Sequence, residues 1–217
     1  MLSAVMSFPS PPLQPLSTAA LPTVTNYRTR ELNHDSNMSG AFDIDTLLSH
    51  NRDYAAGHQA LPTIPEMRSM GVTPQTFLVT CVDPRCVPET FLNYTPMDGI
   101  ITVRNAGGNL EAALPELLAL DTMAQFKNIM VIKHTDCGTL VFKDDEVKAS
   151  LAEKVPSAKG EIEKMVFGSL NGKTLEEGLK EQVAAVKGSQ LVRPEIKSSI
   201  RGFIFDIANG GLTEVDV

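Results

Sequence analysis

A chain of 217 residues, of which 42% are hydrophobic and 21% charged, is long and apolar enough for one globular domain with appendages. A formal net charge of -7, with no basic patch, argues against nucleic acid as a partner. No run of about 18 apolar residues occurs, so we expect no transmembrane helix and no membrane partner.

The N-terminal segment differs in composition from the rest of the chain. Five prolines lie within the first 22 positions, and no acidic residue precedes Glu31. This composition predicts a disordered leader or N-terminal extension at residues 1–41, followed by a folded domain at residues 42–217. The lack of acidic residues is also typical of a mitochondrial presequence, although no arginine-rich amphipathic helix can form before Arg28.

The first part of the folded domain predicts a helix, a loop and a strand. Asp43 can cap a helix that continues through Leu47 and Leu48 toward Ala56. Prolines at positions 62, 65 and 74 then predict a loop. The apolar run at residues 77–80 predicts a buried strand.

The remaining pattern alternates between strands and helices. Further strands are predicted at residues 99–103 and 128–133, separated by a largely buried helix at residues 112–126. Helical patterns return at residues 161–167 and 175–186, and residues 202–215 predict a C-terminal hairpin around Asn209-Gly210-Gly211. We therefore expect an α/β fold with a central, mostly parallel sheet covered by helices, an N-terminal helical arm and a C-terminal hairpin.

The cysteines indicate chemistry with free thiols. Cys81, Cys86 and Cys137 form an odd and sparse set, which argues against a disulfide framework. Such a set fits a reducing compartment, where thiols can bind a metal or react. With no clear signal for export, the default localisation is cytoplasmic, and the mitochondrion is the alternative.

Two short segments carry the residue types of a metal site. One is CVDPR at residues 81–85, and the other is HTDCG at residues 134–138. Each follows a predicted strand directly, and in open α/β sheets ligands bind outside the carboxyl ends of strands. Thiolate and imidazole are preferred zinc ligands, and three protein ligands with an open fourth position are typical of a catalytic site. Water in that position can have its pKa lowered to about 7, which provides hydroxide for attack on an electrophilic carbon such as that of CO2.

Asp83 and Arg85 complete this interpretation. They alternate with Cys81, so in an extended segment all three side chains point to one side. The carboxylate and the guanidinium can pair through charge-assisted hydrogen bonds. A paired Asp83 could orient the zinc water, whereas a released Asp83 could ligate zinc as a fourth ligand and close the site.

The two segments, VRNAGG at residues 103–108 and the closing GFIFDIANGGLTEV at residues 202–215 resemble the β-class carbonic anhydrases in order and spacing. The resemblance covers about residues 42–217. It implies the fold of that family and a zinc lyase that reversibly hydrates carbon dioxide to bicarbonate.

The resemblance also implies roles for individual residues. Cys81, His134 and Cys137 would ligate one Zn2+ per subunit, and Asp83 and Arg85 would form the catalytic dyad. Gly107 and Gly108 would bind substrate through a turn whose glycines permit close approach of the backbone. A homodimer or a higher even oligomer is implied, with N-terminal helices that wrap the partner.

Other interpretations of the same residues stay open. The substrate of an unchanged zinc site could be COS or CS2, because the shape of the pocket would decide it. Alternatively, Cys81 and Cys86 could form a regulatory thiol pair, with zinc as an inert structural ion. Taken alone, Cys86 is more simply a small buried hydrophobic residue, and Asp136 is more simply a surface or supporting residue than a ligand.

Overall fold

The computed structural model describes residues 43–217, so the predicted leader at residues 1–41 lies outside the described residues. The chain divides into two units, residues 1–58 and 59–217. In the first unit, helix α1 (Ile44–Ala56) begins after Asp43, whose carboxylate accepts a hydrogen bond from the Thr46 backbone N–H at 2.8 Å. The predicted capped helix is therefore confirmed. None of the residues of α1 is buried.

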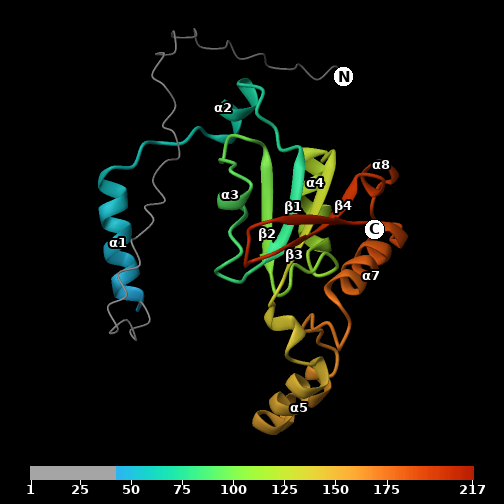
Figure 1. Ribbon diagram of the computed structural model, residues 1–217. Helices are drawn as coiled ribbons and strands as arrows, with labels where there is room; N and C mark the ends of the chain where they lie inside the picture. The colour runs from blue at the N-terminus through green and yellow to red at the C-terminus, as the bar shows by residue number, and fades with distance from the viewer. Residues whose placement is uncertain (1–42) are drawn as a thin grey trace, which may run out of the picture. The chain divides into compact units, whose positions relative to one another are not determined.

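The second unit is built on a five-stranded sheet with the order β2-β1-β3-β4-β5 (Figure 1). The strands are β1 (Thr76–Cys81), β2 (Ile100–Asn105), β3 (Asn128–His134), β4 (Ile200–Phe205) and β5 (Leu212–Val215). The first four run parallel, and β5 pairs antiparallel with β4. Both the mostly parallel sheet and the C-terminal hairpin are thus confirmed.

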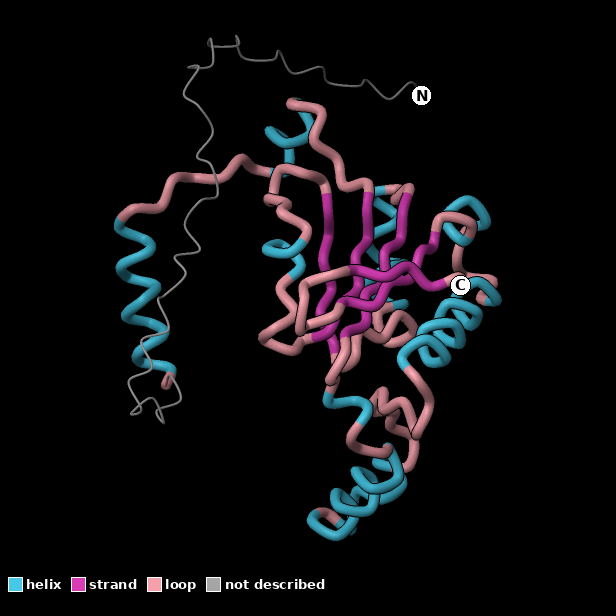
Figure 2. Tube along the Cα trace, viewed as in Figure 1, coloured by secondary structure: helices cyan, strands magenta, loops and turns pink. Residues whose placement is uncertain are grey.

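The register brings the ends of the central strands together. Cys81 pairs with Asn105, and Thr80 pairs with Ile132, two residues before the end of β3. Parallel strands share their carboxyl edge, so the segments that follow β1, β2 and β3 emerge side by side (Figure 2).

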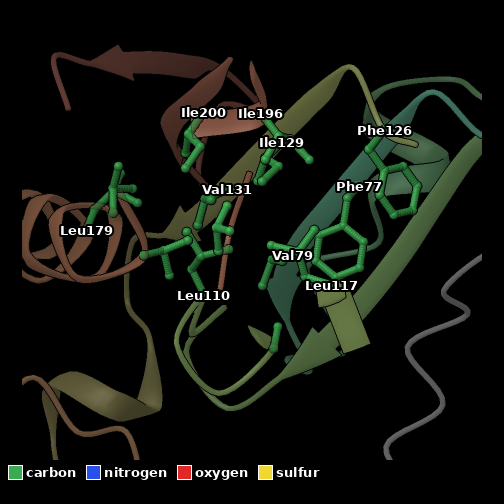
Figure 3. Packing of buried hydrophobic residues seen from close by; sticks show 14 of the residues in the cluster. Phe77, Val79, Leu110, Leu117, Phe126, Ile129, Val131, Leu179, Ile196 and Ile200 are labelled. Carbon is green, nitrogen blue, oxygen red and sulfur yellow. The ribbon is translucent and has the colours of Figure 1, made fainter. Parts of the chain in front are cut away.

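One face of the sheet carries the larger core (Figure 3). Alternate residues of β1 and β3 lie there, packed against helices α4 (Leu114–Ala124), α7 (Leu175–Gly188) and α8 (Pro194–Lys197). The residues of this cluster include Phe77, Val79, Ile129, Val131, Leu117, Leu179, Val183 and Ile196. Burial of one such side chain contributes about 1.5–3 kcal/mol, so this core fixes β1 and β3 against each other.

The opposite face has a smaller core. Leu78, Ile132 and Phe205 are buried there, and the ring of Phe91 from α3 (Pro88–Phe91) stacks on Phe205 with centroids 4.2 Å apart. Cys86 belongs to the same cluster and is fully buried, as expected for a small hydrophobic residue. Helices lie on both faces, but they cover less of this face than of the face with the larger core.

Three local predictions need correction. The helix expected to be largely buried at residues 112–126 is α4, in which only Leu117 is buried. The loop expected around the prolines contains helix α2 (Ile64–Ser69), in which Thr63 and Glu66 form a capping box and Pro65 occupies the first turn. Proline is tolerated at that position because its missing N–H would have no partner within the helix. The helix expected at residues 161–167 is only the short α6 (Lys159–Ile162), after which a loop follows.

That loop is held by Asp144, the first residue of α5 (Asp144–Lys154). The Asp144 carboxylate accepts hydrogen bonds from the backbone N–H groups of Phe167 and Ser169 at 2.9 and 3.0 Å. Short 3-10 helices, η1 (Gly138–Leu140) and η2 (Pro156–Ala158), complete this region. Within residues 43–217, no helix is long and apolar enough to cross a membrane.

Candidate metal centre

Two cysteines and one histidine meet at the carboxyl edge of the sheet. Cys81 ends β1, His134 ends β3, and Cys137 directly precedes η1. All three are buried, and their ligand atoms lie within 4.8 Å of one another. The two sulfurs are 3.9 Å apart. The structure thus brings together the three residues that the sequence singles out, and they could hold one metal ion.

The orientation of His134 leaves one ring nitrogen available. Its Nδ1 lies 2.8 Å from the backbone carbonyl oxygen of Thr135, which can only accept, so Nδ1 carries the hydrogen. In the neutral ring, Nε2 then presents a lone pair. Among the described residues, this Nε2 is the one buried side-chain nitrogen or oxygen that has no hydrogen-bond partner. A buried polar atom without a partner is costly, and a metal ion would satisfy it.

The two thiols differ in their tendency to ionise. The Cys81 thiol lowers the pKa of Cys137 by hydrogen bonding to its sulfur, and the Thr139 hydroxyl acts in the same direction. Conversely, the contact with Cys137 and then burial raise the pKa of Cys81, against which the backbone N–H groups of Asp83 and Gly107 act. One thiolate is therefore favoured without a metal, and two sulfurs with an imidazole nitrogen make a donor set that zinc favours.

The turn at residues 105–108 packs tightly against this centre. Gly108 has φ +57, and a Cβ there would lie 2.7 Å from the backbone oxygen of Ile132. Gly107 has φ +70, and its Cβ would lie 2.8 Å from the side chain of Thr139, whose hydroxyl oxygen is 3.1 Å from the Cys137 sulfur. Both positions therefore require glycine for backbone conformation and for space.

Asp83 and Arg85 form the pair that the sequence predicts. The Arg85 guanidinium donates from Nε to Asp83 Oδ1 at 2.9 Å and from Nη2 to Oδ2 at 2.7 Å. This contact holds the pKa of Asp83 well below its usual range. Asp83 Oδ2 also lies 3.9 Å from His134 Nε2, so the carboxylate borders the space that the three ligand atoms enclose.

Two further residues support the Asp83–Arg85 pair: Asp136, which the sequence predicted as a surface or supporting residue, and Arg104, which sequence reasoning missed. Arg85 also donates to the Asp136 carboxylate at 2.7 Å and to its backbone oxygen at 3.0 Å, which ties together the segments at residues 81–85 and 134–138. Arg104 donates to the backbone oxygens of Cys81 and Asp83 at 3.1 and 2.8 Å. Arg104 is the one charged residue of β2 and was the available signal, but its acceptors are backbone atoms, which no residue pattern displays.

The family model that matches the chain is described as carbonic anhydrase and spans residues 76–212. Beta-carbonic anhydrase 1 of Mycobacterium tuberculosis is 25% identical over 172 residues, which are 79% of this chain and 96% of that protein. A carbon disulfide hydrolase of Saccharolobus solfataricus is 32% identical over 112 residues, which are 51% of this chain and 50% of that protein.

A solved structure shares the fold. The carbonic anhydrase from Glaciozyma antarctica superposes with a TM-score of 0.66 at 24% identity, covering 82% of this chain and all of that chain. The family match extends from β1 to β5 and includes the 81–85 segment, the 105–108 turn and the 134–138 segment. The chain therefore belongs to the β-carbonic anhydrase family.

Proposed function

We propose that this protein binds one zinc ion through Cys81, His134 and Cys137 and catalyses the reversible hydration of carbon dioxide to bicarbonate. The observation that carries the proposal is the meeting of two buried sulfurs with the unpartnered Nε2 of His134, all within 4.8 Å. Family membership supports the same reaction. Zinc with three protein ligands would supply a Lewis acid that lowers the pKa of a water from 15.7 to about 7.

The protein's own residues prepare the site for that chemistry. The Thr135 carbonyl fixes the tautomer and the orientation of His134, so that Nε2 faces the two sulfurs. Asp83, held ionised by Arg85, can accept a hydrogen bond from the attacking water and orient it. If Asp83 left Arg85, its carboxylate would become a fourth ligand and close the site, so Asp83 has both a catalytic and a metal-binding role.

The 105–108 turn forms the proposed substrate side of the centre. Gly107 packs against Thr139, whose hydroxyl oxygen lies 3.1 Å from the Cys137 sulfur, so the turn borders the ligands. We propose that Gly107 and Gly108 bind the substrate, because the absence of side chains at both positions lets the backbone of the turn approach the ligands closely.

A stopped-flow assay of CO2 hydration, paired with zinc analysis of the purified protein, tests this proposal. We expect one zinc per chain and hydration that a chelator abolishes. Cys81→Ser should lose both zinc and activity, because a hydroxyl is a poor zinc ligand. Cys86→Ser is the matched control: Cys86 is also a buried thiol, but its sulfur contacts the Thr80 hydroxyl at 3.1 Å, and zinc should be retained.

The same assay separates the competing substrates. A carbon disulfide hydrolase is among the relatives, so COS and CS2 are offered in parallel to CO2. Hydrolysis of either sulfur compound without CO2 hydration would contradict the carbonic anhydrase proposal. Zinc without any turnover would favour an inert structural site.

We further propose a homodimer or a higher even oligomer. Helix α1 exposes apolar side chains that a second copy could bury: Ile44 is 75% exposed, Leu47 54% and Leu48 51%. Cytoplasmic localisation, with the mitochondrion as the alternative, stays a prediction from the sequence, because residues 1–41 lie outside the described part of the chain.

A further inference from the structure

Lys133 is a buried lysine beside the metal centre. It precedes His134 on β3 and is only 2% exposed. Its Nζ donates to the backbone oxygen of Gly107 and to Oε1 of Gln182 on α7, both at 3.0 Å. Successive side chains of a strand point to opposite faces, so Lys133 reaches the turn while His134 faces the sulfurs.

Gly107, whose backbone oxygen accepts from Lys133, lies in a turn that packs against the surroundings of both sulfurs. Gly108, the next residue of the turn, packs without a Cβ against the backbone of Thr80, which precedes Cys81. Gly107 itself packs without a Cβ against Thr139, whose hydroxyl contacts the Cys137 sulfur. A shift of Gly107 would therefore disturb the surroundings of both sulfurs.

Stability gives no reason for a lysine at this position. Among the described residues, the hydrogen-bond acceptors of Nζ are the Gly107 backbone oxygen and Gln182 Oε1, and neither is a carboxylate. An apolar side chain of similar volume would satisfy the core better, because burial of an unpaired charge is costly.

We propose that Lys133 is a positioning residue of the metal centre, which holds Gly107 and thereby sets the surroundings of the Cys81 and Cys137 sulfurs. This inference rests on the proposed zinc site. Gln182 completes the arrangement: its Oε1 accepts from both Lys133 Nζ and the Leu110 N–H, at 3.0 and 3.4 Å, and so links α7 to the turn.

The test is Lys133→Met, which keeps the length of the side chain and removes the ammonium. Zinc affinity, measured by competition with a chromophoric chelator, should fall about tenfold, the lower end for loss of a group that supports metal ligands. The kcat/KM for CO2 hydration should fall with it. The urea midpoint in excess chelator should stay at or above that of the wild type, whereas a residue kept only for folding would lower it.

Lys187→Met is the matched control. Lys187 Nζ also donates to a backbone oxygen, that of Val217, at 2.8 Å, but it lies outside the metal centre. Its zinc affinity should equal that of the wild type. A third variant, Gln182→Met, removes one of the two acceptors of Lys133 and should weaken zinc binding in the same direction by a smaller factor.

The outcomes separate this inference from the proposed function. A wild-type protein that binds no zinc overturns the proposed function itself. A wild type that binds zinc, together with unchanged affinity in Lys133→Met, overturns the positioning role alone. If Lys133→Met does not fold, Gln182→Met decides, and wild-type affinity in that variant overturns the positioning role.

Discussion

Asp83 lies between Arg85 and the three candidate metal ligands. Its two oxygens accept from Arg85, and Oδ2 also lies 3.9 Å from the histidine nitrogen that faces the sulfurs. Arg85 is itself held by Asp136, so the carboxylate has a fixed partner on the side away from the ligands. This geometry suits an acceptor that orients one water.

Replacement of Asp83 by alanine should leave the metal bound and reduce turnover. Because the attacking water loses its acceptor, we expect kcat to fall about 10²-fold or more, the usual range for a positioned proton acceptor. Stopped-flow assays and zinc analysis on the same sample measure both quantities. Full activity in Asp83→Ala would remove the dyad from the mechanism.

The thiols predict how zinc affinity depends on pH. The pKa of Cys81 is raised and that of Cys137 lowered by their mutual hydrogen bond, so near neutral pH one sulfur still carries a proton. Zinc requires both as thiolates, and binding must release that proton. Affinity should therefore rise as pH increases from about 6 to 8, with proton release visible by calorimetry in buffers of different ionisation enthalpy. Affinity independent of pH would show that both thiols are already ionised.

At the residue scale, the sequence predicts side chains that act directly and misses those that act through the backbone. Cys81, His134 and Cys137 were predictable because their residue types suit a metal and each segment follows a strand. Arg104 and Lys133 donate to backbone carbonyl oxygens, which no residue pattern displays. Asp136 was predictable as a surface or supporting residue, but its pairing with Arg85 was not, because that pairing depends on how the two segments meet.

The 105–108 turn is the element that connects β2 to the centre. Gly108→Ala should lower the free energy of unfolding by about 2–4 kcal/mol, because it adds a steric clash to a left-handed conformation. Gly210→Ala is the matched control, since Gly210 has φ +76 but open space around its Cα. It should cost only about 1 kcal/mol. Urea denaturation measures both, and equal losses would show that the close approach of Gly108 does not matter.

At the element scale, strands were predicted more reliably than short helices. The buried strands β1 and β3 contain unbroken apolar runs, which can be recognised from the local sequence alone. Helix α2 was missed because three prolines outweighed the capping box of Thr63 and Glu66. Helix α6 ended early because Asp144 binds the following backbone, a contact across 23 and 25 positions that local periodicity cannot reveal.

At the scale of the whole molecule, α1 exposes the apolar side chains of Ile44, Leu47 and Leu48. Leu47→Asp combined with Leu48→Asp should shift the proposed oligomer toward monomer, because a buried carboxylate is costly at an interface. Light scattering after size exclusion measures the mass. Asn51→Asp, on the same helix, adds a charge without removing an apolar group and should keep the oligomer. A monomeric wild type would contradict the oligomer proposal.

The architecture concentrates its chemistry at one edge of the sheet, where two segments far apart in the chain meet. Zinc K-edge X-ray absorption tests this meeting most directly. We predict two sulfur scatterers at about 2.3 Å and a histidine nitrogen at about 2.0–2.1 Å around one zinc per chain. A zinc environment of nitrogen and oxygen only, or with a single sulfur, would contradict a centre built from Cys81, His134 and Cys137.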